Sequence, residues 1–350
     1  MTIKVPSPYV AHDGDVSRDR DAVLSIWHGN LGNQNLIASK YDWFYLNGPD
    51  GPPLLQLLQH TSSKNWVGTV SAGPRRMQWL GRDILAGLLV DMAIMQEHRS
   101  LGPALILQQG LIAASKHQLD LLIGFPNPKA AAIFKRIGYD KLADVVRYAR
   151  VLRHARYLRN ILPGWLATPL ATIADIACMV RDAFQRRLGP RLFSTWSDHA
   201  DSRMDQMWED SPHSDGLIAI RDSRRAKWRF DDSPLASTRY LLITARGEDR
   251  LLAWFAIQTE NEILHVRDFW SVEGDGGIGK PIINTLLAVA HTTGAVAISV
   301  EIAGVEAHLK GWKDCGFTAR GNRPVFGHWC SSEMTSRTVN VFLTSADEDE

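Results

Sequence analysis

Hydrophobic and polar positions follow two periods along the first part of the chain, which separate predicted helices from predicted strands. The helical period predicts a helix over 17–30 and a second one from Leu101 to Lys116. Apolar runs bounded by turn residues predict strands at 54–58, 65–71, 85–95, 119–125 and 143–152, and a short helix at 128–137 stops at Gly138. Strands that alternate with helices in this way predict an α/β domain over residues 1–152.

The second part of the chain repeats this order with weaker signals. Similar segments come into register at an offset of about 175–187 residues. They are YDWFYLN (41–47) with KWRFDDS (227–233), NWVGTVS (65–71) with LLAWFAI (251–257), LVDMAIM (89–95) with HVRDFWSV (265–272), and IFKRIGY (133–139) with GWKDCGF (311–317). Trp43 and Trp228 hold matching places in this repeat, and we expect both to pack in cores.

The repeat predicts a domain organisation. We expect two domains of α+β type, each with a central mixed sheet flanked by helices, at 1–152 and 216–345. A helical connector is expected at 153–215, and the acidic residues 346–350 are expected to form a disordered tail.

Residues 161–180 are the most apolar long segment, and we expect a helix of a soluble protein rather than a transmembrane span, because two prolines and Asp175 interrupt them. Thr168 is the predicted N-cap, with Pro169 at the first helical position. The stripe expected to face the core is Leu170, Ile173, Ala174, Ala177, Val180 and Phe184. Contact with a membrane surface is the alternative, because Arg147, Arg150, Arg153, Arg156 and Arg159 precede the segment.

Composition limits the function classes without selecting one. The chain has 350 residues, of which 45% are hydrophobic and 22% charged, as is typical of a folded protein with a sizeable core. A formal net charge of +1 gives no reason to expect nucleic acid as a partner, so the basic run RDSRRAKWRF (221–230) is expected to be a solvated surface. Three cysteines without metal-ligand spacing, and the lack of an apolar leader, predict a cytoplasmic protein with neither disulfides nor a metal site.

The gap between the strand at 85–95 and the helix at 101–116 carries the clearest chemical signal. A glycine-bearing turn before a helix presents backbone N–H groups and the positive end of the helix dipole, which together bind phosphate oxygens. Gly102 allows close approach of a ligand to the backbone, and Arg99 can add a charge-assisted contact. The predicted pyrophosphate cradle consists of Arg99, Ser100, Leu101, Gly102, Pro103 and Ala104.

Two motifs in this order give a resemblance to a known family. VDMAIMQEHRSLGPALILQQGLI followed by GFPNPKAAAIFKRIGY resembles the GNAT superfamily of acyl-CoA-dependent N-acyltransferases, over about residues 20–150 and faintly over 216–330. The resemblance implies that the strand at 88–95 parts from its neighbour and offers backbone groups around Ala93 and Met95 to the pantetheine arm. It further implies that Asn127, Phe134, Gly138 and Tyr139 lie along that arm.

The resemblance also implies direct transfer, in which an amine attacks the thioester carbonyl and coenzyme A leaves. An alkyl ammonium has a pKa of about 10.4, so a base must take its proton. Asp91 is the first candidate because it interrupts an apolar strand, and an ion pair with a neighbouring arginine or a bond to a loop is the alternative role. Glu97 and His98 are further candidates. Phe134 replaces the tyrosine that protonates the thiolate in many members, which leaves the general acid unassigned.

The sequence thus predicts an N-acyltransferase that uses acetyl-CoA or another acyl-CoA and acylates a small-molecule or peptide amine, such as an amino sugar. The second domain keeps a Gly-x-Gly in GIGKP (277–281) but has no basic residue at the position of Arg99, and it is expected to be a degenerate copy. His265, Arg267 and Asp268 on its central strand are expected to form an internal salt bridge or to line a cleft. The alternatives are an aminoacyl-tRNA-dependent transferase that resembles the peptidoglycan-bridge enzymes, or a noncatalytic coenzyme A-binding module; a homodimer is left open.

Overall fold

Both halves of the chain follow the same order of elements, as the sequence repeat predicts. The computed structural model describes residues 7–154, 164–331 and 340–348. In the first half these are β1 (Tyr9–Gly14), α1 (Arg20–Trp27), α2 (Ile37–Tyr41), β2 (Leu54–His60), β3 (Trp66–Trp79), β4 (Arg82–Ile94), α3 (Leu101–Ser115), β5 (Leu121–Gly124), α4 (Pro128–Arg136) and β6 (Asp140–Val151).

The second half begins with elements that precede its repeat unit. They are α6 (Gly164–Leu188), β7 (Leu192–Ser197), α7 (Arg203–Asp210) and β8 (Leu217–Ala219). The repeat unit then comprises α8 (Ser223–Ala226), β9 (Arg239–Ala245), β10 (Leu251–Glu260), β11 (Ile263–Ser271), α9 (Lys280–Thr292), β12 (Ala297–Ala303), α10 (Glu306–Asp314) and β13 (Thr318–Trp329), and β14 (Val341–Thr344) follows it. The connector expected at 153–215 is therefore not purely helical, because β7 pairs with β9 at the sheet edge.

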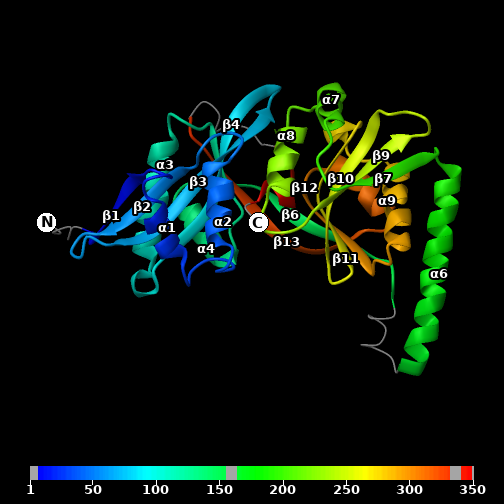
Figure 1. Ribbon diagram of the computed structural model, residues 1–350, viewed down its shortest axis with the longest axis horizontal. Helices are drawn as coiled ribbons and strands as arrows, with labels where there is room; N and C mark the ends of the chain where they lie inside the picture. Colours follow the sequence, from blue (N-terminus) through cyan, green and yellow to red (C-terminus); the bar gives the residue numbers. More distant parts are fainter. Residues whose placement is uncertain (1–6, 155–163, 332–339, 349–350) are drawn as a thin grey trace.

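All of these strands join one mixed sheet in which the halves exchange their last strands. The order is β1-β2-β3-β4-β5-β13-β6-β12-β11-β10-β9-β7. In the described sheet, two pairs of neighbouring strands along this path are parallel. They are β4 with β5 in the first half and β11 with β12 in the second half. Because β13 lies between β5 and β6, each half completes the sheet of the other, and Figure 1 shows β6 and β13 crossing between the two lobes.

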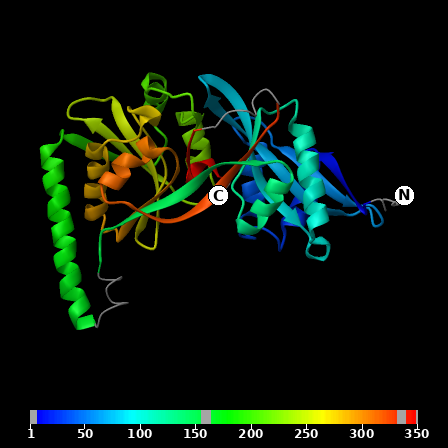
Figure 2. The same ribbon diagram turned by 180° about the vertical axis from the view of Figure 1, so that it is seen from behind.

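Helices cover both faces of the first lobe. Figure 1 shows α1 and α2 on one face of the sheet, and Figure 2 shows α3 and α4 on the other. Val90 and Ala93 of β4 pack with residues of α1 and α2, whereas Ile94 packs with residues of α3. Strand β4 is therefore buried on both faces, which explains its long apolar sequence.

Trp43 and Trp228 join the two halves through a reciprocal contact. Their rings stack with centroids 4.7 Å apart, and each lies in a π-helical turn, at Asp42–Leu46 and Lys227–Asp231. The indole N–H of Trp43 donates to the carbonyl of Trp228 at 2.7 Å, and that of Trp228 donates to the carbonyl of Trp43 at 3.2 Å. The prediction that both tryptophans pack in cores is confirmed, and the two rings pack against each other.

Two expectations about charged segments are wrong. Ala346 and Asp347 of the expected disordered tail belong to a buried short helix over Ser345–Asp347, and Asp347 pairs with Arg75 at 2.7 Å and with Arg221 at 2.9 Å. In the basic run expected to be solvated, Arg221, Arg225 and Arg229 are buried. Of the residues expected to form an internal salt bridge, Asp268 does so, and its partner at 2.8 Å is Arg221 from the basic run. Opposite charges from distant parts of the chain compensate each other at the junction of the two halves, which composition alone does not reveal.

The expectations about the helix after residue 160 are also wrong in two respects. Helix α6 starts at Gly164 rather than after Thr168, so Pro169 lies inside it. Of the stripe expected to face the core, Ile173, Val180 and Phe184 are 65%, 59% and 61% exposed, Ala177 is exposed, and the side chain of Leu170 lies outside the described residues. The face turned toward the protein instead carries Asp182, which the buried Arg150 requires as a partner. None of the helices in the described part of the chain is both long and apolar enough to cross a membrane.

The Arg150–Asp182 pair predicts a measurable acid sensitivity. Arg150 donates to both carboxylate oxygens of Asp182 at 2.6 and 2.5 Å, and His291 lies 3.2 Å away. Burial alone raises the pKa of Asp182, but the hydrogen bonds of His291 and Arg150 outweigh burial and hold that pKa below its ordinary 3.8. The folded state therefore releases this proton more readily than the unfolded chain, so the contribution to stability is present above about pH 4 and is lost as the pH falls through the lowered pKa.

We expect the Asp182→Asn variant to be less stable than the wild type at neutral pH and to lose less free energy of unfolding between about pH 5 and about pH 3. Urea unfolding at a series of pH values measures both. Parallel pH dependences in the two proteins would show that this pair does not respond to acid.

Candidate active site

A cavity of about 660 Å³ opens where β4 and β5 separate. The two strands pair only over Ala86–Leu88 and Leu121–Ile123, so the later part of β4 has no partner in β5. The lining comes from both faces of the sheet and from the second half, and it includes Trp27, Leu31, Lys40, Val90, Asp91, Met92, Gln108, Phe125, Asn127, Phe134, Leu235 and Ala236. The size is typical of a small-molecule site, and the end of the pairing after Leu88 agrees with the strand separation that the resemblance implies.

Asp91 lies in this cavity at a bulge in β4. The register between β3 and β4 shifts between Thr69 and Ser71, and Asp91 adopts a φ of 53°. The left-handed region is uncommon for residues other than glycine, although aspartate and asparagine tolerate it. Bulges re-aim side chains next to functional sites, and this one directs Asp91 toward α2.

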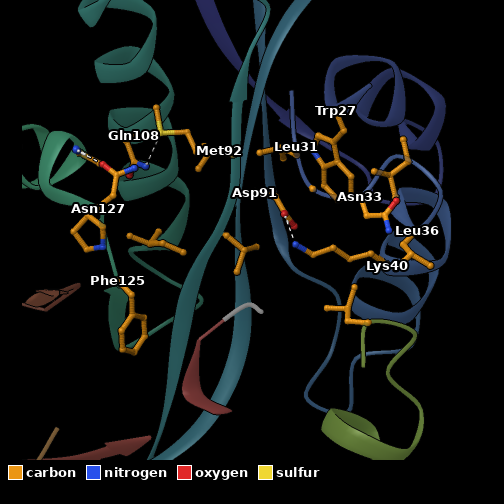
Figure 3. Close-up of a pocket in the computed structure, with 18 of the residues that line it drawn as sticks. Trp27, Leu31, Asn33, Leu36, Lys40, Asp91, Met92, Gln108, Phe125 and Asn127 are labelled. Atoms are coloured by element: carbon orange, nitrogen blue, oxygen red, sulfur yellow. Dashed lines mark hydrogen bonds and ion pairs between the residues drawn. The ribbon is translucent and has the colours of Figure 1, made fainter. Parts of the chain in front are cut away.

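Two side chains hold the Asp91 carboxylate. The Lys40 ammonium donates to Oδ1 at 2.7 Å, and the Tyr45 hydroxyl donates to Oδ2 at 3.1 Å. Figure 3 shows Lys40 reaching Asp91 from the side of α2, with Met92 and Gln108 on the opposite side of β4. Burial, with the Asp91 charge beside it, raises the pKa of Tyr45 well above 10, so the tyrosine remains a donor.

Sequence reasoning missed both partners. It weighed an arginine or a loop as the neighbour of Asp91, and the structure supplies a lysine that is 51 positions away in sequence. The repeated segment YDWFYLN contains Tyr45, but nothing in its spacing points to Asp91.

The residues of the predicted pyrophosphate cradle differ in their exposure to solvent. Arg99, Ser100, Leu101 and Gly102 are exposed at the start of α3, whereas Pro103 and Ala104 are buried. A Cβ added at Gly102 would meet nothing within 4 Å, so the space in front of this turn is open. The side chain of the N-cap Ser100 makes no capping hydrogen bond, which leaves N–H groups of the first turn for a ligand. Arg99 donates from Nε to the carbonyl of Ile94 at 3.0 Å and also contacts Asn30.

Three other predicted residues do not lie where the sequence suggested. The N–H of Met95 donates to the carbonyl of Val67 at 2.8 Å, so it is not available to a ligand as expected. The extra residue of the bulge shifts the alternation of backbone groups along this strand. Glu97 is exposed, and His98 contacts the Tyr9 hydroxyl at 3.0 Å; neither is among the residues that line the cavity. Ala93 stands opposite Thr69 on β3.

The β5–α4 segment forms the opposite wall of the cavity. Asn127 accepts the Ala130 N–H at 3.0 Å and thus caps α4, while it also lines the cavity. Phe134 lines the cavity and lies 4.9 Å from the ring of Tyr139. Gly138 has a φ of 89°, a conformation that ends α4 as the sequence predicts. Tyr139 is buried behind Phe134 rather than in the lining, and burial raises its pKa, so it has a packing role.

Gln108 is a cavity residue that the sequence did not single out. Its Oε1 atom is buried and has no hydrogen-bond partner among the residues that the structure describes. Its amide nitrogen lies 3.5 Å from the sulfur of Met92. A buried acceptor without a partner is costly, and a ligand N–H group at this site would satisfy it.

Comparisons with known proteins identify the fold. No family model matches the sequence, and no curated protein matches it. A conserved Enterococcus faecalis protein of unknown function matches with a TM-score of 0.64 at 8% identity, over 93% of this chain and 73% of that one. A GCN5-related N-acetyltransferase from Kribbella flavida matches with a TM-score of 0.59 at 12% identity, over 92% and 71%. The N-myristoyltransferase of Saccharomyces cerevisiae with bound myristoyl-CoA matches with a TM-score of 0.54 at 11% identity, over 94% and 80%.

These matches extend over nearly the whole chain, and the sequence identities are low. The chain therefore has the tandem GNAT fold of N-acetyltransferases and N-myristoyltransferase. The mixed α/β fold class and the two-copy architecture inferred from the sequence are confirmed.

Proposed function

We propose that this protein is an acyl-CoA-dependent N-acyltransferase that binds its donor in the first half and transfers the acyl group to an amine. The observation that carries the proposal is the cavity between the parted strands β4 and β5, with a buried carboxylate, Asp91, in its wall. A fold alone hosts many functions, whereas a buried carboxylate in the wall of a cavity of this size is a feature of a specific site.

The residues present fit an acyl-CoA donor. The open space at Gly102 and the uncapped N–H groups of α3 suit a pyrophosphate, and Arg99 stands beside them. The orphan Oε1 of Gln108 suits an amide N–H of the pantetheine arm. The donor supplies the activated acyl group as a thioester, and the chain's contribution is to hold it and to receive a proton.

The transfer places one proton on the protein. The amine nitrogen bonds to the thioester carbonyl carbon, and the carbon–sulfur bond breaks. Asp91 accepts the first proton, which the ammonium must lose before attack, and the second proton passes to solvent as the amide forms and coenzyme A leaves as the thiolate. Lys40 and Tyr45 hold the carboxylate in place. Phe134 offers no proton for the leaving sulfur, and a thiol with a pKa of about 8.5 is a tolerable leaving group as the thiolate.

The second half supports this site and has lost its own cradle. A Cβ at Gly274 would lie 1.8 Å from the carbonyl oxygen of Pro212, and one at Gly277 would lie 2.7 Å from that of Ala307. Protein atoms thus fill the space beside these two glycines, whereas the space at Gly102 is open. The second half instead adds Leu235 and Ala236 to the cavity wall.

An assay of thiol release tests the proposal. The purified protein is incubated with acetyl-CoA or a longer acyl-CoA and a panel of amino sugars, small amines and peptides, and free coenzyme A is measured. We expect release that depends on one class of amine. Donor binding without release across the panel would favour a noncatalytic module, and salt-sensitive binding of tRNA without acyl-CoA binding would favour an aminoacyl-tRNA-dependent transferase.

The Gly102→Glu variant tests the cradle separately. Two like charges about 4 Å apart near a protein surface repel by about 4 kcal/mol, so we expect the affinity for acyl-CoA to fall at least about tenfold. Equilibrium dialysis measures the dissociation constant. Gly276→Glu is the matched control, because Gly276 also faces open space but lies in the second half. Equal affinities in the two variants would place the donor elsewhere.

A further inference from the structure

Helix α6 exposes its apolar face to solvent. Ile173, Ile176, Val180 and Phe184 are between 50% and 65% exposed, and they follow the spacing of a single helix face. Figures 1 and 2 both show α6 along the outer edge of the second lobe, farthest from the first lobe. A contiguous exposed apolar stripe of this kind marks an interaction surface.

The acidic side chains of α6 face the protein, and its basic side chains are exposed to solvent. Its two acidic residues face the protein, where Asp182 pairs with Arg150 and Asp175 lies 2.6 Å from His154. Its basic residues, Arg181, Arg186 and Arg187, are all exposed. Among the described residues of α6, the exposed charged side chains are therefore all positive.

We propose that α6 docks the protein on an anionic lipid surface, with the apolar stripe in the interface and the arginines at the headgroups. A helix with a wide apolar face and arginines beside it is the form that lies in the plane of a membrane surface. Anionic lipids attract such basic residues. The helix lies on the bilayer rather than across it, since its hydropathy is too low for a span.

Charge argues against a second copy as the occupant. In a two-fold dimer the same patch meets itself, so the arginines of one α6 would approach those of the other. Both acidic residues of the helix are turned inward and are not available to compensate them.

Co-sedimentation with vesicles tests the proposal and does not depend on catalysis. The full-length protein is mixed with vesicles of phosphatidylcholine alone, or with roughly equal amounts of phosphatidylglycerol. We expect binding to the anionic vesicles only, and a bound fraction at least about fivefold smaller for the double variant Ile173→Glu/Phe184→Glu and for Arg186→Glu/Arg187→Glu. Val10→Glu/Val305→Glu is the matched control for Ile173→Glu/Phe184→Glu, since both valines are exposed outside α6 and the charge change is the same in these two variants.

Thermal unfolding of each variant shows that the substitutions leave the fold intact, because every substituted side chain is exposed. Three results would overturn the proposal. They are no sedimentation of the wild type with anionic vesicles, equal binding to neutral vesicles, and a dimer in light scattering that Ile173→Glu/Phe184→Glu converts to a monomer.

Discussion

The Asp91→Asn variant is expected to bind acyl-CoA like the wild type and to lose turnover by about 10²–10⁴-fold, the usual contribution of a positioned general base. Asparagine has the shape of aspartate and tolerates the left-handed φ of 53° at this position. Its amide oxygen can still accept from Lys40, and its NH2 group can donate to the Tyr45 hydroxyl, but the side chain cannot take a proton from an amine. The substitution therefore removes the base and leaves the bulge in place.

Steady-state kinetics of acyl transfer measure this effect. The account predicts a lower kcat with little change in the KM for the donor. Tyr45→Phe is the control, because it removes one hydrogen bond to Asp91 and keeps the carboxylate. If Asp91→Asn and Tyr45→Phe have the same activity, Asp91 is not the base.

The Asp347→Asn variant is expected to lower the free energy of unfolding by about 3–5 kcal/mol, the cost of breaking a buried ion pair on one side. Asp347 pairs with Arg75 and Arg221, and the side chain of Arg221 is fully buried. Asp268 remains as a partner of Arg221, but Arg75 would lose the carboxylate that lies 2.7 Å away. An uncompensated buried guanidinium at the junction of the two halves destabilises the whole sheet.

Urea unfolding at neutral pH measures the difference. Asp249→Asn is the matched control, because Asp249 also pairs with an arginine but is 94% exposed, and exposed pairs contribute about 0–1 kcal/mol. A loss for Asp347→Asn as small as that of the control would mean that the tail does not stabilise the junction.

Local periodicity predicted the elements that build the site. The segments 85–95, 101–116, 119–125 and 128–137 are β4, α3, β5 and α4 in the structure, because each has a clear period and a clear stop. The exchange of β6 and β13 between the halves was not predictable in this way, since strand pairing is a contact between residues distant in sequence.

Contacts between distant residues explain the other differences. Lys40 meets Asp91, and Asp347 meets Arg75, through the fold and not through any spacing in sequence. In α6 the period correctly identified an apolar face, but a period does not say whether another element covers that face. The exposed apolar stripe of α6 thus differs from the predicted core-facing stripe, and this difference indicates an interaction surface.

Calorimetric titration with acetyl-CoA and with acyl-CoAs of increasing length tests the central claim most directly. The account predicts one donor per chain, bound in the first half, with binding that the Arg99→Glu variant loses or strongly weakens. The absence of binding to any acyl-CoA, or binding that Arg99→Glu leaves unchanged, would contradict it.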